Sequence, residues 1–353
     1  MGYHPVMLRV ATCLLLLLAP ASALYAQAAA AEREALLFDD APLREEVVHP
    51  AWFKLSFLHL HEDLREAVKA GKRGLIVYFG QKHCPYCEML MKVNFGKPDI
   101  VAYTRKHFDV VALDAQGDAM VTTLAGKELS ERALAESENL SFTPSLVFYD
   151  AAGREALRLR GYYPPYRFRA ALEYVADGHY LRESFRAYLA RADASMVFEE
   201  GGLNHQDFFA PAPYNLARHQ VRANRPLVVF FEQGDCHACD VLHTGPMEEA
   251  LLRQKFEALD AVQLDLWAET PVVTPSGERT TSRAWAERLG LFYAPTLLFF
   301  DETGREILRV DSVAHFYRLN RVLDYVTSGA YRTGASFQSW QRQGAPKSGA
   351  EKP

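Results

Sequence analysis

The chain has 353 residues, of which 49% are hydrophobic and 24% charged, and its formal net charge is −5 at pH 7. This length predicts two domains, because a single domain usually takes about 100–200 residues. The composition is that of a globular protein and excludes a disordered chain or a bundle of membrane spans. The negative charge gives no basic footprint for nucleic acid.

Residues 1–26 have the composition of a secretory signal peptide. His4 and Arg9 precede an apolar run over 10–19, and Ala21-Ser22-Ala23 supplies the small residues of a cleavage site. The run is shorter than the roughly 20 residues that span a bilayer. We therefore expect an exported, periplasmic protein that loses its leader together with Cys13; an uncleaved anchor is the alternative.

Four cysteines remain beyond the leader, and they form two CxxC pairs. The pairs Cys84-Pro85-Tyr86-Cys87 and Cys236-His237-Ala238-Cys239 lie 152 residues apart, and other landmarks recur at a step of 151 or 152. A register held over so long a stretch indicates the duplication of a whole domain. We expect a signal peptide over 1–26, a lead-in over 27–50, a first domain over 51–189, a linker over 190–212, a second domain over 213–340 and a disordered tail over 341–353.

Each copy is predicted to alternate strands and helices. The apolar runs that precede the CxxC pairs suit buried strands, and helices opened by a Ser or Thr cap follow the second strands. Helices on both faces of a mixed sheet are the expected architecture. In chain order we expect strands at 75–80, 109–114 and 145–149 with helices at 88–93 and 130–139 in the first copy, and strands at 227–232, 261–266 and 296–300 with helices at 240–254 and 281–289 in the second.

A CxxC pair that opens a helix after a buried strand is suited to thiol–disulfide exchange. Unpaired N–H groups and the helix dipole favour a thiolate at the first cysteine, whose pKa falls below the free value of about 8.5. The second cysteine, one turn on, attacks the mixed disulfide that the first has formed. We assign Cys84 and Cys236 as attacking thiols and Cys87 and Cys239 as resolving thiols. The reactive groups are then redox-active disulfides, and we expect no other cofactor and no metal.

Two other roles of the cysteines stay open. Structural zinc would need both pairs, although the pairs of a zinc ribbon usually lie about 15–20 residues apart. A structural disulfide is the second alternative, and it applies more to the second pair than to the first. A CxxC disulfide closes so small a loop, however, that it gains little stability from chain entropy.

The order of strand, CxxC, helix and a later x-Pro that opens a strand resembles the thioredoxin fold. The resemblance implies an α/β protein with two thioredoxin-like domains in tandem, each a mixed central sheet flanked by helices. The segments YFGQKHCPYCEML and SFTPSLVFYDAAGREALRLRGYYPP are similar, more particularly, to periplasmic SoxW-type thioredoxins. That likeness covers residues 52 to about 188, and residues 213 to about 340 match the same pattern less closely.

The resemblance also implies which residues meet a substrate. In that family the proline is cis and its loop offers main-chain contacts, which places this role on Thr143-Pro144 and Ala294-Pro295. The loop after the last strand of the first copy lies near the active site in this fold. Its Gly161 and Tyr162 are therefore candidates for contact with an extended peptide; the alternative is that Tyr162 only caps the core.

This chain departs from the family at two features of the site. Many members carry a buried Asp six residues before the first cysteine, whereas Tyr78 and Phe230 stand there in this chain, so protons must move through water or another group. Lys82 and His83 precede the first pair and should stabilise its thiolate. Asp235 precedes the second pair and should do the reverse, unless these exposed charges are screened.

We therefore expect an enzyme, an exported thiol–disulfide oxidoreductase that exchanges with cysteine pairs of exported proteins. The SoxW-type resemblance implies a reductase that draws electrons from a membrane thiol transporter. The CPYC motif with Thr143 is also similar to isomerase and oxidase members of the fold. A redox-linked binding or chaperone adaptor, with one catalytic and one docking domain, is a further alternative.

Overall fold

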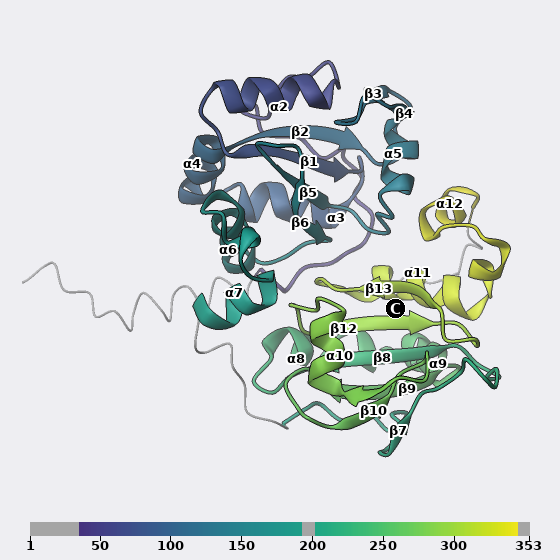
Figure 1. Cartoon of the computed structure of the whole chain (residues 1–353). Coiled ribbons are helices and arrows are strands. Elements are labelled where there is room, and N and C mark those ends of the chain that lie inside the picture. The colour runs from purple at the N-terminus through teal and green to yellow at the C-terminus, as the bar shows by residue number, and fades with distance from the viewer. Residues whose placement is uncertain (1–34, 193–201, 345–353) are drawn as a thin grey trace, which may run out of the picture.

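The computed structural model describes residues 35–192 and 202–344 of the chain. The signal peptide expected over 1–26 lies outside these residues. Within them, no helix is long and apolar enough to cross a membrane. Figure 1 shows two α/β units, one from each half of the chain, stacked with their sheets one above the other.

The first unit begins with a helix that covers its sheet. Its elements in chain order are α2 (Leu60–Lys69), β1 (Gly74–Gly80), α3 (Pro85–Met89), the π-helical turn η1 (Leu90–Asn94), α4 (Pro98–His107), β2 (Phe108–Asp114), β3 (Met120–Thr122), β4 (Glu128–Ser130), α5 (Glu131–Ser137), β5 (Ser145–Asp150), β6 (Glu155–Arg160), α6 (Pro165–Ala176), η2 (His179–Leu181) and α7 (Phe185–Ala192). The strand order is β2-β1-β5-β6. β1 is parallel to β2 and antiparallel to β5, and all its residues are buried, as its apolar run predicts.

The second unit repeats this plan. Its elements are β7 (Tyr214–Asn215), β8 (Leu227–Glu232), α8 (His237–Thr244), η4 (Pro246–Glu248), α9 (Ala250–Glu257), β9 (Asp260–Asp265), β10 (Pro271–Val273), β11 (Arg279–Thr281), α10 (Ser282–Arg288), β12 (Thr296–Phe300), β13 (Glu306–Val310), α11 (Phe316–Thr327), η5 (Ala330–Thr333) and α12 (Phe337–Arg342). The sheet has the order β9-β8-β12-β13, and β8 is parallel to β9 and antiparallel to β12. The predicted fold class, two α/β units in tandem with mixed sheets and flanking helices, is confirmed.

Local sequence signals set several boundaries. Ser130 and Thr281 cap α5 and α10, and each hydroxyl accepts a hydrogen bond from the N–H three residues on, as predicted. The prediction of a single helix over 240–254 is wrong, because the α-helix is interrupted between α8 and α9. Pro246 follows Gly245 at that point and has no N–H to continue the ladder.

Three segments expected outside the domains are part of the folded structure. In the lead-in over 27–50, Leu36 and Asp40 are buried. In the linker over 190–212, Phe209 pairs with Ala261 of β9 through a β-bridge. The helix α12 extends to Arg342, two residues into the expected tail. These segments lack a long periodic pattern, but each places a few side chains against a core that distant parts of the chain build.

The last helix of each unit also contacts the other unit across the interface. α7 of the first unit reaches the second, where Arg186 donates hydrogen bonds to the carbonyls of Leu266 and Leu291, both at 2.9 Å. α12 of the second unit reaches the first, where Gln338 donates to the carbonyl of Leu140 at 3.0 Å. In Figure 1, α7 and α12 accordingly lie at opposite ends of the interface.

Candidate active site

The first CxxC pair lies at the N-terminus of α3, directly after β1. Cys84 is the N-cap residue, and its Sγ accepts a hydrogen bond from the N–H of Cys87 at 3.0 Å. Pro85 takes the first helical position, where its missing N–H costs nothing. The two cysteines form a disulfide. Cys84 is 7% exposed and Cys87 is fully buried. Exchange with a partner must therefore begin at the Cys84 sulfur.

The loop before β5 brings Thr143 to the same sulfur. The peptide bond between Thr143 and Pro144 is cis, and both residues are buried. The Thr143 carbonyl oxygen lies 3.6 Å from Cys84 Sγ, and its hydroxyl donates to that sulfur at 3.3 Å. A hydroxyl that donates to the sulfur favours the thiolate when the disulfide is reduced.

Tyr86, inside the CxxC motif, joins the active site to the lead-in and to the second unit. Its hydroxyl donates to Asp40 Oδ2 at 2.7 Å and accepts from the N–H of His315 at 2.9 Å. Asp40 in turn accepts from the main-chain N–H of Tyr317 and Arg318 in the first turn of α11, at 2.9 and 2.8 Å. Burial raises the pKa of Tyr86 well above its ordinary value. This side chain is therefore a neutral structural link between the two units.

A groove with a volume of about 500 Å³ opens beside Cys84. The first unit contributes Lys82, Cys84 and Thr143 to its lining, and the second contributes Arg318, Phe337 and Gln338. Both units therefore line the groove beside the first disulfide.

The second CxxC pair repeats the geometry of the first. Cys236 caps α8, and its Sγ accepts from the N–H of Cys239 at 3.1 Å. The two residues form a disulfide, and Cys239 is fully buried. The peptide bond between Ala294 and Pro295 is cis, and the Ala294 carbonyl oxygen lies 3.7 Å from Cys236 Sγ. Alanine supplies no counterpart of the Thr143 hydroxyl, so this sulfur lacks that hydrogen bond.

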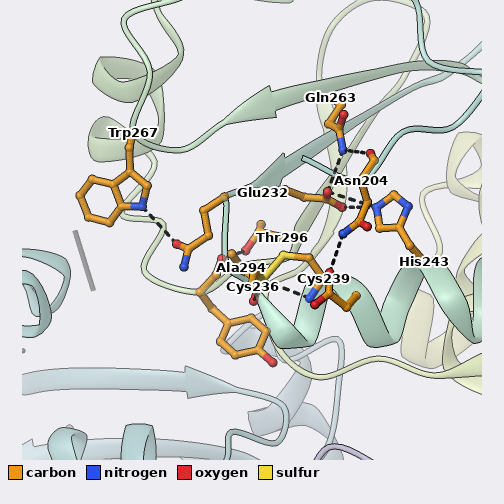
Figure 2. The surroundings of a disulfide bond; sticks show 12 residues. Asn204, Glu232, Cys236, Cys239, His243, Gln263, Trp267, Ala294 and Thr296 are labelled. Atoms are coloured by element: carbon orange, nitrogen blue, oxygen red, sulfur yellow. Dashed lines mark hydrogen bonds and ion pairs between the residues drawn. A yellow bond between two sulfur atoms is a disulfide. The ribbon is translucent and has the colours of Figure 1, made fainter. Parts of the chain in front are cut away.

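A buried acid pairs with a histidine beside the second disulfide, and sequence reasoning missed this pair. Glu232, the last residue of β8, and His243 of α8 are 0% and 3% exposed. His243 Nε2 lies 2.9 Å from Glu232 Oε1, and Gln263 donates to Oε2 at 2.8 Å. Figure 2 shows this cluster on one side of the disulfide and Trp267 on the other. The sequence does carry one signal for this pair, because Glu232 is the single acid at the end of the otherwise apolar run 227–232.

The positions at which the family often has a buried Asp hold no acid. Tyr78 and Phe230 are both fully buried, and burial raises the pKa of Tyr78 above its ordinary value. Neither side chain takes up a proton at neutral pH. In the second unit, Glu232 is the nearby acid instead, whereas Gly80 occupies the equivalent position of the first.

The structure places Gly161 and Tyr162 at the interface between the units. Tyr162 is 0% exposed, and its carbonyl accepts from the N–H of Val313 at 3.2 Å. Gly161 has a φ of 99°, and a Cβ there would lie 1.9 Å from Ser312 Oγ. The equivalent loops of the two units thus pack on each other. The expectation that these two residues line a peptide groove is corrected, because the second unit covers them.

The three flanking charges lie at the surface. Lys82 pairs with Glu46 at 3.0 Å, and both side chains are about 60% exposed. His83 and Asp235 are exposed as well. Exposed charges are weakened by solvent and salt, and Glu46 opposes the charge of Lys82. The proposed tuning of the two thiolates by these residues stays a prediction.

One protein family matches both units of the chain. The thioredoxin-like domain family matches residues 60–176 and again 216–327. A thioredoxin-fold protein from Helicobacter pylori is 25% identical, covers 33% of this chain and 82% of its own, and has a TM-score of 0.30. A thioredoxin from Thermus thermophilus is 28% identical, with coverage of 33% and 83% and a TM-score of 0.26.

A DsbH oxidoreductase is 16% identical, covers 41% of this chain and 98% of its own, and has a TM-score of 0.27. No curated protein sequence matches the chain. The two family matches together span more than half of the chain, and each includes one CxxC pair. The chain therefore belongs to the thioredoxin-like family, with two copies of the domain, and carries the cysteine pairs with which that family performs thiol–disulfide exchange.

Proposed function

We propose that the protein is an exported thiol–disulfide oxidoreductase that reduces disulfides of periplasmic proteins through Cys84 and Cys87. One observation carries the proposal: Cys84 caps a helix beside the Thr143–Pro144 loop and borders a groove of about 500 Å³. The signal-peptide pattern of residues 1–26 supports export. The resemblance of the first copy to SoxW-type thioredoxins supports the reducing direction.

The reaction needs two exchange steps. The Cys84 thiolate attacks a substrate disulfide, so one substrate sulfur leaves as a thiolate and a mixed disulfide forms. Cys87 then loses its proton and attacks Cys84 Sγ, which releases the second substrate thiol and leaves the Cys84–Cys87 disulfide. Two electrons must return to this pair in each cycle, and we propose a membrane thiol transporter as their source.

A second candidate is a disulfide isomerase or oxidase, and one contact favours it. The buried guanidinium of Arg318 donates to the Thr143 carbonyl at 2.8 Å and lies over the Tyr86 ring at 3.4 Å. A cation near Cys84 stabilises its thiolate, which makes the disulfide more oxidising. The reduction potential of the first pair separates the two directions, because a value near −270 mV is typical of a reductase and one near −120 mV of an oxidase.

A trapping experiment tests the proposed chemistry. The Cys87→Ser variant should hold substrates as mixed disulfides on Cys84, and Cys84→Ser should hold none. The matched variant Cys239→Ser tests the second pair in the same way. The wild-type protein should reduce insulin disulfides with dithiothreitol as electron source. A protein that traps nothing and does not accelerate insulin reduction over dithiothreitol alone would favour the redox-linked binding adaptor.

Export is tested separately. The full chain, expressed with a C-terminal tag in a Gram-negative host, should appear in the periplasmic fraction with a new N-terminus at about residue 24 or 27. Recovery in the cytoplasm with residues 1–26 intact contradicts the proposal, and a full-length protein in the membrane fraction indicates an anchor.

A further inference from the structure

The two units contact each other through a reciprocal pair of arginines. Arg167 at the start of α6 and Arg318 at the start of α11 occupy equivalent positions of the repeat, and each reaches the proline loop of the other unit. Arg167 donates to the carbonyl of Phe292 at 2.5 Å, and Arg318 donates to that of Thr143 at 2.8 Å. The same sequence position therefore serves both proline loops.

The two arginine contacts are not equivalent, and the contact of Arg318 involves a residue that touches the first disulfide. Arg318 binds the residue that directly precedes Pro144 and contacts Cys84, whereas Arg167 binds three residues before Pro295. The Arg318 guanidinium also lies 3.4 Å from the Tyr86 ring centroid. Ala238 occupies the equivalent position of the second motif and offers no ring. Arg318 is 9% exposed, while Arg167 is half-buried.

The Thr143 carbonyl links the Arg318 guanidinium to the Cys84 sulfur. That oxygen lies 3.6 Å from Cys84 Sγ, and the negative end of its dipole opposes a negative sulfur. The hydrogen bond from Arg318 offsets this dipole and adds a positive charge in a poorly solvated place, where charges interact strongly. The cation persists despite burial, because a guanidinium does not lose its proton in proteins.

Other charged and titratable groups of both signs surround this centre. Asp40 lies under the first turn of α11 and hydrogen-bonds the Tyr86 hydroxyl. Groove-lining groups are Lys82 and His83 before α3, Asp114 at the end of β2, and Arg321 one turn beyond Arg318. Tyr163 and Asp311 also interact electrostatically with Arg318.

We propose that Arg318, a residue of the second unit, is a positioning residue for the catalytic centre of the first: it holds the Thr143 carbonyl and stabilises the Cys84 thiolate. The second unit would then be part of the machinery that sets the reactivity of the first pair. The inference rests on the proposed function only in taking Cys84 as the attacking thiol.

The test measures the pKa of Cys84 directly. In the full chain with Cys13, Cys87, Cys236 and Cys239 replaced by Ser, thiolate absorbance at 240 nm and the rate of iodoacetamide alkylation are followed against pH. Arg318→Met should raise the pKa of Cys84 by about one unit, the lower end of the range for an opposite charge at close range. Arg318→Gln should raise it by less than Arg318→Met, since Gln keeps a donor for the Thr143 carbonyl and loses only the charge, and Arg318→Lys, which keeps the charge, should raise it by less than Arg318→Met as well.

Arg167→Met is the matched control, and it should leave the pKa of Cys84 unchanged. With Cys87 restored, Arg318→Met should also lower the reduction potential of the first pair. A tenfold change in the exchange equilibrium with glutathione corresponds to about 30 mV. If folded Arg318→Met and Arg318→Gln titrate like the parent, the proposal is overturned. The same holds if Arg167→Met shifts Cys84 equally. Because the thiolate is observed without substrate, a failed trapping experiment does not affect this result.

Discussion

Replacing Asp311 by Asn should change how stability depends on pH. Asp311 follows β13 at the interface between the units, where its carbonyl accepts from the Tyr163 hydroxyl at 2.8 Å. Its side chain is buried, and burial raises the pKa of the carboxyl to about 6, against the attraction of Arg160 and Arg309. The Arg160 guanidinium lies 3.9 Å from Oδ2, too far to offset the loss of water.

The sign of the effect follows from proton binding. The folded protein binds the Asp311 proton more tightly than the unfolded chain, whose pKa stays near the ordinary 3.8. The stabilisation linked to this proton is therefore complete below pH 4 and is lost as the pH rises through about 6. A shift of about two units at 1.36 kcal/mol each corresponds to about 3 kcal/mol.

Urea unfolding of the parent and of Asp311→Asn, from pH 4 to pH 8, measures this loss. Asn is neutral throughout, so the variant should gain up to about 3 kcal/mol over the parent between pH 4 and pH 7. Asp99→Asn, at a side chain that is 71% exposed, is the matched control and should give a flat difference. A flat difference for Asp311→Asn as well would refute the assigned shift.

Two further predictions concern buried contacts. Glu232→Ala should lower the free energy of unfolding by about 3–5 kcal/mol, because it leaves His243 and Gln263 without their buried partner; chemical denaturation measures it, and a loss under 1 kcal/mol would contradict the buried pair. Arg186→Met should leave two interface carbonyls unsatisfied, at about 1–3 kcal/mol each. Faster amide exchange at the end of β9 and before β12 reports this loosening; unchanged exchange there speaks against it.

The elements that were predictable from the sequence are those that short patterns determine. The apolar run before Cys84 predicted the buried strand β1, and Ser130 and Thr281 marked the starts of α5 and α10. The repeated spacing of the CxxC pairs predicted two equivalent units. Each signal acts within a few residues of the structure that it produces, so it survives without knowledge of the tertiary contacts.

The parts that the sequence did not reveal depend on contacts between distant segments. The resemblance makes Tyr162 a candidate for peptide contact because the family's loop lies near the active site, but this side chain is 0% exposed, as in the alternative that it only caps the core. Asp40, in a segment expected to be only a lead-in, caps α11 nearly 280 residues later. Neither role has a local pattern, because both arise only where the two units meet.

The duplicated domain explains why equivalent positions have come to differ. Packing two similar units face to face brings their proline loops against each other's arginines, so a change on one side alters the surroundings of the other disulfide. Thr143 and Tyr86 provide the first unit with a hydroxyl at Cys84 and a ring under Arg318. The second unit has Ala294 and Ala238 at these positions and has Glu232 where the first has Gly80. The two disulfides thus share one backbone geometry in different polar surroundings, which predicts unequal reduction potentials for the two pairs within a single chain.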